Sequence, residues 1–390
     1  MKRIAILGST GSIGTNAADV IRTHPDDFRA AALAVARNAR AGLEQAVSLR
    51  CPLLAVADPA AADGIRADAA RAGVEIVAGP GAAAEVAARA EADMVLVSLV
   101  GLSGLRPALA AIEAGRDVAL ATKEVLVAAG EYVMARAAAK GVRIIPVDSE
   151  HSAVFQCIQE RAGAPGFPCG ALPPPASVTL TASGGPFLDS PADLSKVTPR
   201  MALDHPRWKM GPKVTVDSAT MMNKGFEMLE ARWLFDIPLE RIGVVVHPES
   251  TVHSLVTFED GSTMAQLAPP DMRIPIQYAF SWPERLPAER AALDLPAIGA
   301  LTFRKPDETR FPCLSLVRAA AAAGGTAAAA LSAADEIAVE RFLAGEIAFT
   351  DIPRLVEKAM NAAASPSCSS LEDILETDAR ARAFASAALR

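Results

Sequence analysis

The chain has 390 residues, of which 51% are hydrophobic and 21% charged, a composition typical of a globular protein with two or three domains rather than a disordered one. Its net charge of −7 offers no basic surface for nucleic acid, so an anionic ligand has to be held by local groups. The five scattered cysteines, and the lack of a signal-peptide pattern or an uncharged segment of membrane length, predict a cytoplasmic protein without a zinc–thiolate site.

Residues 4–7 form a continuous apolar run typical of a buried parallel strand, and a glycine-rich turn from Gly8 to Gly14 follows it directly. A helical stretch at 15–23 comes next. Strand, turn and helix N-terminus together can bind an anion, because free backbone N–H groups and the helix dipole point at the ligand. The glycines are spaced by three and three rather than as Gly-x-Gly-x-x-Gly, so an ordinary tight turn stays open as the alternative.

The second predicted strand, 30–36, ends where NAD-binding sheets carry an acidic residue for the ribose hydroxyl. This chain has Arg37 and Asn38 there, with Arg40 close behind. A guanidinium suits a 2′-phosphate, so the sequence favours NADP over NAD. Further strands separated by alanine-rich helical stretches are predicted at 53–56, 75–77, 94–99, 117–120 and 142–147. This alternation predicts a Rossmann-like, doubly wound parallel sheet over residues 1–147.

Acidic residues follow the last of these strands, at the sheet edge where ligands bind. Asp148 and Glu150 are two positions apart, which in an extended chain places both carboxylates on one side. They repel each other unless a cation, a proton or a cationic side chain joins them. With Glu227 they would form an oxygen-rich site for Mg²⁺ or Mn²⁺. A helix N-cap at Ser149, flanked by acids that favour the helix dipole, explains the same residues without a metal.

The segment 214–235 combines polar and apolar residues in an unusual way. We predict a strand end at 214–217 that runs into a helix capped by Ser218. Within that helix Asn223 and Glu227 share a face, Lys224 lies beside them, and Gly225 indicates a close approach of another group. Apolar residues surround these polar groups almost completely, which favours a functional site over a solvated Lys–Glu pair.

The rest of the chain is predicted to complete a central α+β catalytic domain at 148–281 and a C-terminal helical bundle at 311–390, joined by a linker at 282–310. A proline- and glycine-rich variable loop is expected at 161–175. The remaining elements are strands at 178–182, 242–246 and 252–258, a hairpin turn at 259–262 and a helix at 274–280. The long stretch near 184–213 carries His205 and Trp208, and its length is typical of a functional lid.

Six motifs along nearly the whole chain resemble those of the 1-deoxy-D-xylulose 5-phosphate reductoisomerase family. They are Gly8-Ser-Thr-Gly-Ser-Ile-Gly14, Lys123-Glu124, Val147-Asp-Ser-Glu-His151, Ser183-Gly-Gly-Pro-Phe187, His205-Pro-x-Trp208-x-Met-Gly211 and Val216-Asp-Ser-Ala-Thr-Met-Met-Asn-Lys-Gly-x-Glu227. The resemblance implies an enzyme of the non-mevalonate isoprenoid pathway that uses NADPH and one divalent ion, Mg²⁺ or Mn²⁺. It would convert 1-deoxy-D-xylulose 5-phosphate to 2-C-methyl-D-erythritol 4-phosphate, by skeletal rearrangement followed by hydride reduction. It also implies a homodimer.

The resemblance also implies roles for individual residues. The cofactor would be bound by Thr10, Gly11, Ser12, Ile13, Ala36, Arg37, Asn38, Thr122, Glu124 and Gly211. The substrate would be surrounded by Lys123, Ser149, Glu150, Ser183, His205, Trp208, Ser218, Asn223, Lys224 and Glu227. Catalytic roles would fall to Lys123, Asp148, Glu150, His205 and Glu227, and the metal ligands would be Asp148, Glu150 and Glu227.

The chain departs from the family pattern in two places, at Thr122, where an asparagine is common, and at Ala36-Arg37, where Gly-Lys is common. Judged from the residues alone, two other classes remain open. A plain NADP-dependent dehydrogenase would need no convergent carboxylates and no divalent ion. A non-catalytic NADP-binding sensor would have no reason to keep Asn223, Lys224 and Glu227 within an otherwise apolar helix.

Overall fold

The computed structural model describes residues 1–158, 175–287, 292–368 and 370–388. Its N-terminal part is a seven-stranded parallel sheet with the order β4-β3-β2-β1-β5-β6-β7. The strands are β1 (Lys2–Leu7), β2 (Phe28–Val35), β3 (Leu53–Val56), β4 (Glu75–Ala78), β5 (Met94–Val97), β6 (Asp117–Leu120) and β7 (Ile144–Pro146). The predicted doubly wound sheet is confirmed, and the strand at 142–147 is shorter than expected.

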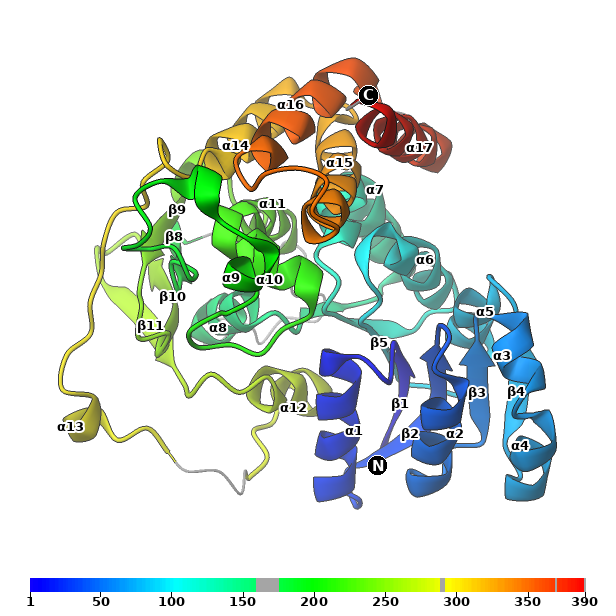
Figure 1. The fold of residues 1–390 in the computed structure, drawn as a ribbon. Coiled ribbons are helices and arrows are strands. Elements are labelled where there is room, and N and C mark those ends of the chain that lie inside the picture. Colours follow the sequence, from blue (N-terminus) through cyan, green and yellow to red (C-terminus); the bar gives the residue numbers. More distant parts are fainter. Residues whose placement is uncertain (159–174, 288–291, 369, 389–390) are drawn as a thin grey trace.

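Helices connect the strands of this sheet (Figure 1). They are α1 (Ser12–Thr23), α2 (Ala39–Ser48), α3 (Pro59–Asp63), α4 (Arg66–Ala72), α5 (Ala82–Arg89), the 3-10 turn η1 (Gly101–Gly104), α6 (Leu105–Glu113) and α7 (Glu124–Lys140). The chain starts at the central strand β1, moves outward to β4 and returns to β5 on the other side of β1. The strand order therefore reverses between β1 and β5, and this switch point is where parallel sheets bind ligands.

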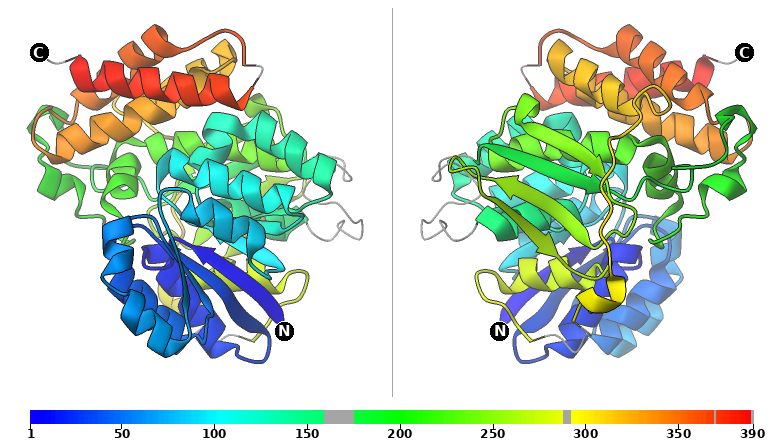
Figure 2. Two further views of the ribbon diagram at one scale, coloured as in Figure 1. Left: turned by 90° about the vertical axis from the view of Figure 1, so that its right-hand side faces the viewer. Right: turned by 90° about the vertical axis from the view of Figure 1, so that its left-hand side faces the viewer.

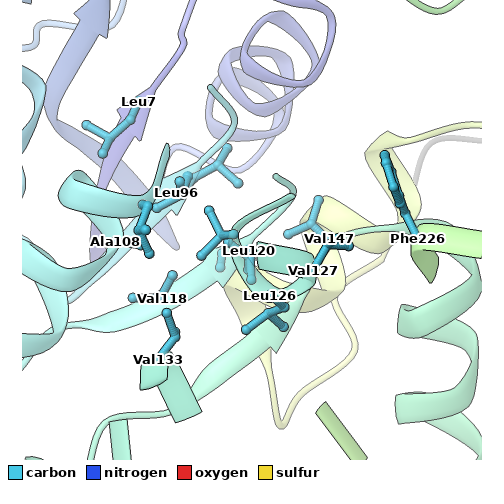
Figure 3. Close-up of a cluster of buried hydrophobic side chains, with 14 of the residues drawn as sticks. Leu7, Leu96, Ala108, Val118, Leu120, Leu126, Val127, Val133, Val147 and Phe226 are labelled. Atoms are coloured by element: carbon cyan, nitrogen blue, oxygen red, sulfur yellow. The ribbon is translucent and has the colours of Figure 1, made fainter. Parts of the chain in front are cut away.

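The strands of the N-terminal sheet read as apolar runs because helices and the rest of the chain cover them. Figure 3 shows side chains from three neighbouring strands, Leu7, Leu96 and Leu120, in one cluster that extends to Val147 and to Phe226 of α11 (Met222–Phe235). Each of these side chains is at most 1% exposed. The hydrophobic core thus continues from the N-terminal sheet into the segment 214–235.

The central part is built on a four-stranded mixed sheet with the order β11-β10-β8-β9 (Figure 2, right). Its strands are β8 (Ser177–Ala182), β9 (Ile242–Val246), β10 (Val252–Thr257) and β11 (Thr263–Leu267). Strand β8 pairs parallel with β9 and antiparallel with β10, and β10 pairs antiparallel with β11. Around the sheet lie α8 (Ser149–Ile158), η3 (Leu194–Lys196), α9 (Pro199–Ala202), α10 (Pro212–Thr220), α11, η4 (Leu239–Arg241) and α12 (Arg273–Ser281). This is the predicted α+β arrangement.

The predicted strand end at 214–217 is wrong. These residues lie in α10, whose first position is Pro212, and Met221, with φ 66°, separates α10 from α11. Proline at the first helical position has its φ preset for a helix and lacks an N–H that the helix would not use. Ser218 therefore lies in the last turns of α10 and caps nothing. The alternation of valines with polar residues led to a wrong strand prediction, because α10 is buried on several sides and its polar residues do not mark a solvent-exposed face.

One other local expectation needs correction. Glu150 lies in the first turn of α8, so Asp148 and Glu150 are not in an extended chain. The backbone of α8 brings their side chains together instead. The described part of the predicted linker at 282–310 contains the short helix α13 (Leu295–Ile298), and Arg304 forms a bridge with Val246 of β9. The variable loop expected at 161–175 falls outside the described residues except for its last position.

The C-terminal part is helical, as predicted. It consists of α14 (Cys313–Ala323), α15 (Ala327–Leu343), α16 (Asp351–Ala363) and α17 (Leu371–Ala387), which lie at the opposite end of the molecule from the N-terminus (Figure 2). Helix α15 packs against α7 and α10 as well as against its own neighbours. No helix among the described residues is long and apolar enough to cross a membrane.

Candidate active site

A cavity of about 290 Å³ lies where the switch point of the N-terminal sheet, the mixed sheet and helices α8, α10 and α11 meet. Most of the predicted site residues line it: Gly11, Ser12, Ile13, Thr122, Lys123, Glu124, Asp148, Ser149, Glu150, Ser183, His205, Trp208, Gly211, Ser218, Asn223, Lys224 and Glu227. The structure therefore gathers residues from all six sequence motifs around one volume. Four predicted cofactor residues do not line it: Thr10, Ala36, Arg37 and Asn38.

The glycine-rich turn forms one end of the cavity. Gly8 has φ +91°, and a Cβ on Gly14 would lie 2.2 Å from the Gly8 carbonyl oxygen, so both positions require glycine. Helix α1 starts at Ser12, with no side-chain cap and no acidic residue in its first turn. Its first N–H groups are consequently free for an anion, and Ser12 and Ile13 line the cavity. These features fit the pyrophosphate of a dinucleotide.

Arg37 and Asn38 are exposed just after β2. The turn lies beside this strand, because the backbone N–H groups of Gly8 and Ser9 donate to the Ala34 carbonyl at 2.9 and 3.0 Å. The two residues therefore leave the sheet at the same edge as the glycine-rich turn. This position fits contacts with the far end of a nucleotide that extends out of the cavity.

Three carboxylates converge at the other end of the cavity. Asp148 precedes α8, Glu150 lies in its first turn and Glu227 comes from α11, and carboxylate oxygens of the three lie within 4.8 Å of one another. An all-oxygen set of this kind suits a hard divalent cation such as Mg²⁺ or Mn²⁺. The alternative interpretation, a helix N-cap at Ser149, is wrong, because Ser149 is the first residue of α8 and its Oγ donates to Glu150 Oε2 at 2.8 Å. Asp148 precedes the helix instead, and its Oδ1 accepts from the Glu150 N–H at 3.4 Å.

Two lysines and an amide tie these carboxylates together. Lys123 Nζ lies 2.6 Å from Asp148 Oδ2 and donates to Glu227 Oε1 at 3.0 Å and to Asn223 Oδ1 at 2.7 Å. Lys224 Nζ forms an ion pair with Glu227 Oε2 and lies 3.7 Å from Glu150 Oε1. Lys224 and Glu227 are only 5% and 1% exposed. A solvated surface pair, the simplest alternative for this helix, is therefore ruled out.

Burial and mutual charge shift the ionisation of this group. Burial alone would raise the pKa of Asp148, but Lys123 and His151 hold it well below its usual value. Burial raises the pKa of Glu150 to about 8, opposed by Lys224 and reinforced by Glu227 and the Asp148 carboxylate. A divalent cation at this place would stabilise the ionised form of Glu150.

A layer behind the carboxylates was not found from the sequence. His151 and Glu230 are fully buried, and His151 Nδ1 lies 3.6 Å from Asp148 Oδ1 and 3.4 Å from Glu230 Oε2. Burial alone would lower the pKa of His151, but Glu230 and Asp148 raise it to about 9. His151 Nε2 also lies 2.8 Å from the Glu227 carbonyl oxygen, so it fixes two carboxylate-bearing segments at once. In the sequence, His151 follows Asp148 by three residues and Glu230 follows Glu227 by three residues. This spacing was the signal that could have identified them.

The mixed sheet and the predicted lid supply a set of hydrogen-bond donors. Ser183 follows β8, and its Oγ lies 2.9 Å from His205 Nε2. His205 Nδ1 accepts from the N–H groups of Arg207 and Trp208 at 3.2 and 2.9 Å, so the proton of the neutral ring belongs on Nε2 and is donated to Ser183. Burial lowers the pKa of His205, which favours this neutral form. A Cβ on Gly185 would lie 2.9 Å from the Ser218 carbonyl oxygen, which shows how closely the strand end approaches α10.

Three family models match the chain. One described as 1-deoxy-D-xylulose 5-phosphate reductoisomerase matches residues 4–130, one described as the C-terminal domain of that enzyme matches 144–235, and one described as the DXP reductoisomerase C-terminal domain matches 267–384. Among curated proteins, the 1-deoxy-D-xylulose 5-phosphate reductoisomerase of Symbiobacterium thermophilum is 53% identical over 367 residues, which cover 92% of each chain. That of a Cyanothece strain is 47% identical over 387 residues, covering 98% of each chain.

Solved structures of similar proteins cover the whole chain. A 1-deoxy-D-xylulose 5-phosphate reductoisomerase from Zymomonas mobilis in complex with NADPH is 38% identical, with a TM-score of 0.90 and 99% of that chain covered. A DOX-P reductoisomerase in complex with NADPH, fosmidomycin and magnesium is also 38% identical, with a TM-score of 0.92 and 98% of that chain covered.

Proposed function

Because the chain belongs to the 1-deoxy-D-xylulose 5-phosphate reductoisomerase family, we propose that the cavity between its two sheets is the active site of that reaction. The protein converts 1-deoxy-D-xylulose 5-phosphate to 2-C-methyl-D-erythritol 4-phosphate and depends on NADPH and a divalent metal ion. One observation supports this site most strongly. The nucleotide-type glycine turn and three convergent carboxylates line the same cavity.

Asp148, Glu150 and Glu227 are proposed as the metal ligands, since their oxygens lie within 4.8 Å of one another. When bound, the ion supplies Lewis-acid stabilisation of negative charge on substrate oxygens. Lys123 holds Asp148 and Glu227 in position through its two short contacts. Lys224 does the same for Glu150 and Glu227 and can donate to a substrate oxygen in the cavity.

The donors at the lid side are proposed to hold the substrate phosphate. Ser183, His205, Ser218, Asn223 and Lys224 all line the cavity. The neutral His205 ring offers its Nε2–H, which now bonds Ser183, to a phosphate oxygen that replaces the serine. Trp208 packs its ring 6.2 Å from that of His253, so it presents a fixed apolar wall over the substrate and excludes water.

At the opposite end, Thr10, Gly11, Ser12 and Ile13 are proposed to bind the NADPH pyrophosphate through the turn and the start of α1. Ala36, Arg37 and Asn38 would meet the 2′-phosphate. Thr122, Glu124 and Gly211 would border the nicotinamide end, since all three line the cavity. Thr122 Oγ1 donates to the Leu99 carbonyl at 2.6 Å, so the departure from asparagine leaves a side chain that is bonded to the backbone.

We also propose the organisation of the chain: a cofactor domain at 1–147, a catalytic domain at 148–281, a linker at 282–310 and a helical domain at 311–390. The family relationship supports a cytoplasmic homodimer as the working form. Light scattering at micromolar concentration, giving twice the mass of 40.5 kDa, would test the dimer.

The first test follows NADPH oxidation at saturating 1-deoxy-D-xylulose 5-phosphate after exhaustive chelation, with and without Mg²⁺ or Mn²⁺. Consumption only with metal, yielding a branched polyol phosphate, is expected. Asp148→Asn should abolish this metal-dependent turnover while NADPH binding, measured by fluorescence, stays nearly intact. Oxidation without metal would favour a plain dehydrogenase, and full activity of Asp148→Asn would refute the metal assignment.

A further inference from the structure

Lys213, in the first turn of α10, faces carboxylates from three different parts of the chain. Its Nζ lies 2.6 Å from Asp217 Oδ2 one turn later in α10, 3.0 Å from Asp335 Oδ2 of α15 and 3.3 Å from Glu124 Oε1 at the start of α7. The ammonium also lies 4.7 Å from the centre of the Phe226 ring. The side chains of Lys213, Asp217, Asp335 and Glu124 are 14, 2, 0 and 8% exposed, so this group is almost dry.

One ammonium among three carboxylates leaves an excess of negative charge. Asp217 Oδ1 and Asp335 Oδ1 have no hydrogen-bond partner among the described residues. Burial, together with the charge of Asp335, raises the pKa of Asp217 well above its usual value despite Lys213. Such a buried, unbalanced group stabilises a fold poorly, because desolvation offsets most of the attraction between the charges. Its position next to the cavity suggests a role in the site rather than in the core.

The group connects the cofactor end of the cavity with the end of the lid. Lys213, Asp217 and Glu124 line the cavity, whereas Asp335 does not. Glu124 follows Lys123 directly, so the contact with Lys213 fixes the chain that also delivers the Lys123 ammonium to the metal site. On the other side, Lys213 lies two residues after Gly211, where the lid enters α10. Helix α15, which runs beside α7 (Figure 1), brings Asp335 to this point from the C-terminal bundle.

We propose that Lys213 is a positioning residue for NADPH. It holds Glu124 and the lid end against the cofactor, and its positive charge offsets the negative charge of the carboxylates, which would otherwise repel a polyanionic ligand. Asp335 holds Lys213 in place, which gives the C-terminal helices a part in cofactor binding. This inference rests on the proposed function, because it assumes that NADPH lies along the Glu124 side of the cavity.

The test measures NADPH binding by fluorescence on the full-length protein, without metal or substrate. Lys213→Met should raise the dissociation constant by about tenfold, because Glu124 loses its ion-pair partner and the carboxylates lose the ammonium that offsets their charge towards the cofactor. Lys2→Met is the matched control, since Lys2 is also partly buried and donates to the Phe280 carbonyl at 2.8 Å, but does not line the cavity. It should leave the dissociation constant unchanged. The melting temperature of each variant is recorded beside its affinity.

A second-site change separates positioning from general stability. In the double variant Lys213→Met/Asp335→Asn, one unpaired carboxylate becomes neutral, and NADPH affinity should recover by about threefold or more relative to Lys213→Met. Lys213→Arg should stay within about threefold of the wild type, because it keeps the charge. If Lys213→Met does not fold, Glu124→Gln provides the measurement and should also weaken NADPH binding.

Three results would overturn the inference: a folded Lys213→Met variant with wild-type affinity, a weakened variant that Asp335→Asn does not improve, or a Glu124→Gln variant that binds NADPH normally. A wild-type protein that fails to bind NADPH would instead contradict the proposed function.

Discussion

Binding of Mn²⁺ to the metal-free protein should weaken as the pH falls, because Glu150 must lose a proton before it can ligate the ion. Burial, reinforced by Glu227 and Asp148, raises the pKa of Glu150 to about 8 in the absence of metal. The raised pKa means that the ionised ligand predominates only above about pH 8 and is lost progressively below it. At about pH 7 roughly one molecule in ten carries the ionised form, so the apparent dissociation constant should be about tenfold above its alkaline plateau.

Calorimetry of Mn²⁺ binding at about pH 7 and about pH 9, without NADPH or substrate, would measure this change. At the lower pH, heats in two buffers of different ionisation enthalpy should reveal close to one proton released per ion. Glu150→Gln should bind more weakly overall and lose most of the pH dependence. What remains would come from neighbours such as Glu230, for which burial raises the pKa to about 7.

Glu131→Gln, at an exposed position of α7, is the matched control and should keep the full pH dependence. A wild-type dissociation constant that stays the same over this range would refute the assignment of Glu150 as a buried ligand.

Three further variants test the packing of α11, the glycine-rich turn and the substrate side. Gly225→Ala should lower the free energy of unfolding, measured by urea titration, by about 1–3 kcal/mol, because the alanine Cβ would lie 2.6 Å from Val317 Cγ2. The loss is expected although alanine favours helices more than glycine does. Adding Val317→Ala should recover part of the lost stability. Gly14→Ala should abolish NADPH fluorescence enhancement, since its Cβ would lie 2.2 Å from a backbone oxygen of the turn, and normal binding would contradict the tight-turn argument. His205→Asn should raise the KM for the sugar phosphate by about tenfold and leave that for NADPH unchanged, whereas equal effects on both would argue against a phosphate contact.

Much of the fold could be predicted because its signals are local. The strands at 53–56, 117–120 and 242–246 agree with the structure residue for residue, since each is a short apolar run bounded by helix or turn residues. The strand prediction for residues 214–217 was wrong for a physical reason. Alternation of valine with polar residues indicates a strand only if one face meets water, and in α10 Thr215 and Asp217 are buried as well as Val216.

The candidate site was predictable where its members lie within a few residues of each other. Asn223, Lys224 and Glu227 share one helix, and the spacing of three and four residues placed them on adjoining rows. The contact of Asn223 and Glu227 with Lys123, about a hundred residues earlier, could come only from the family resemblance, because no local pattern sets the distance between α7 and α11.

The C-terminal helices show a further limit of sequence reasoning. Their alanine-rich segment suggested a plain bundle with few reactive groups, yet α15 delivers Asp335 to Lys213 at the edge of the cavity. The two facts are connected, because the alanines of α15 are small enough to let it pack closely against α7 and α10. A short aspartate can then reach an ammonium on the neighbouring helix. The small residues that make this helix look featureless in the sequence are therefore what allows it to take part in the site.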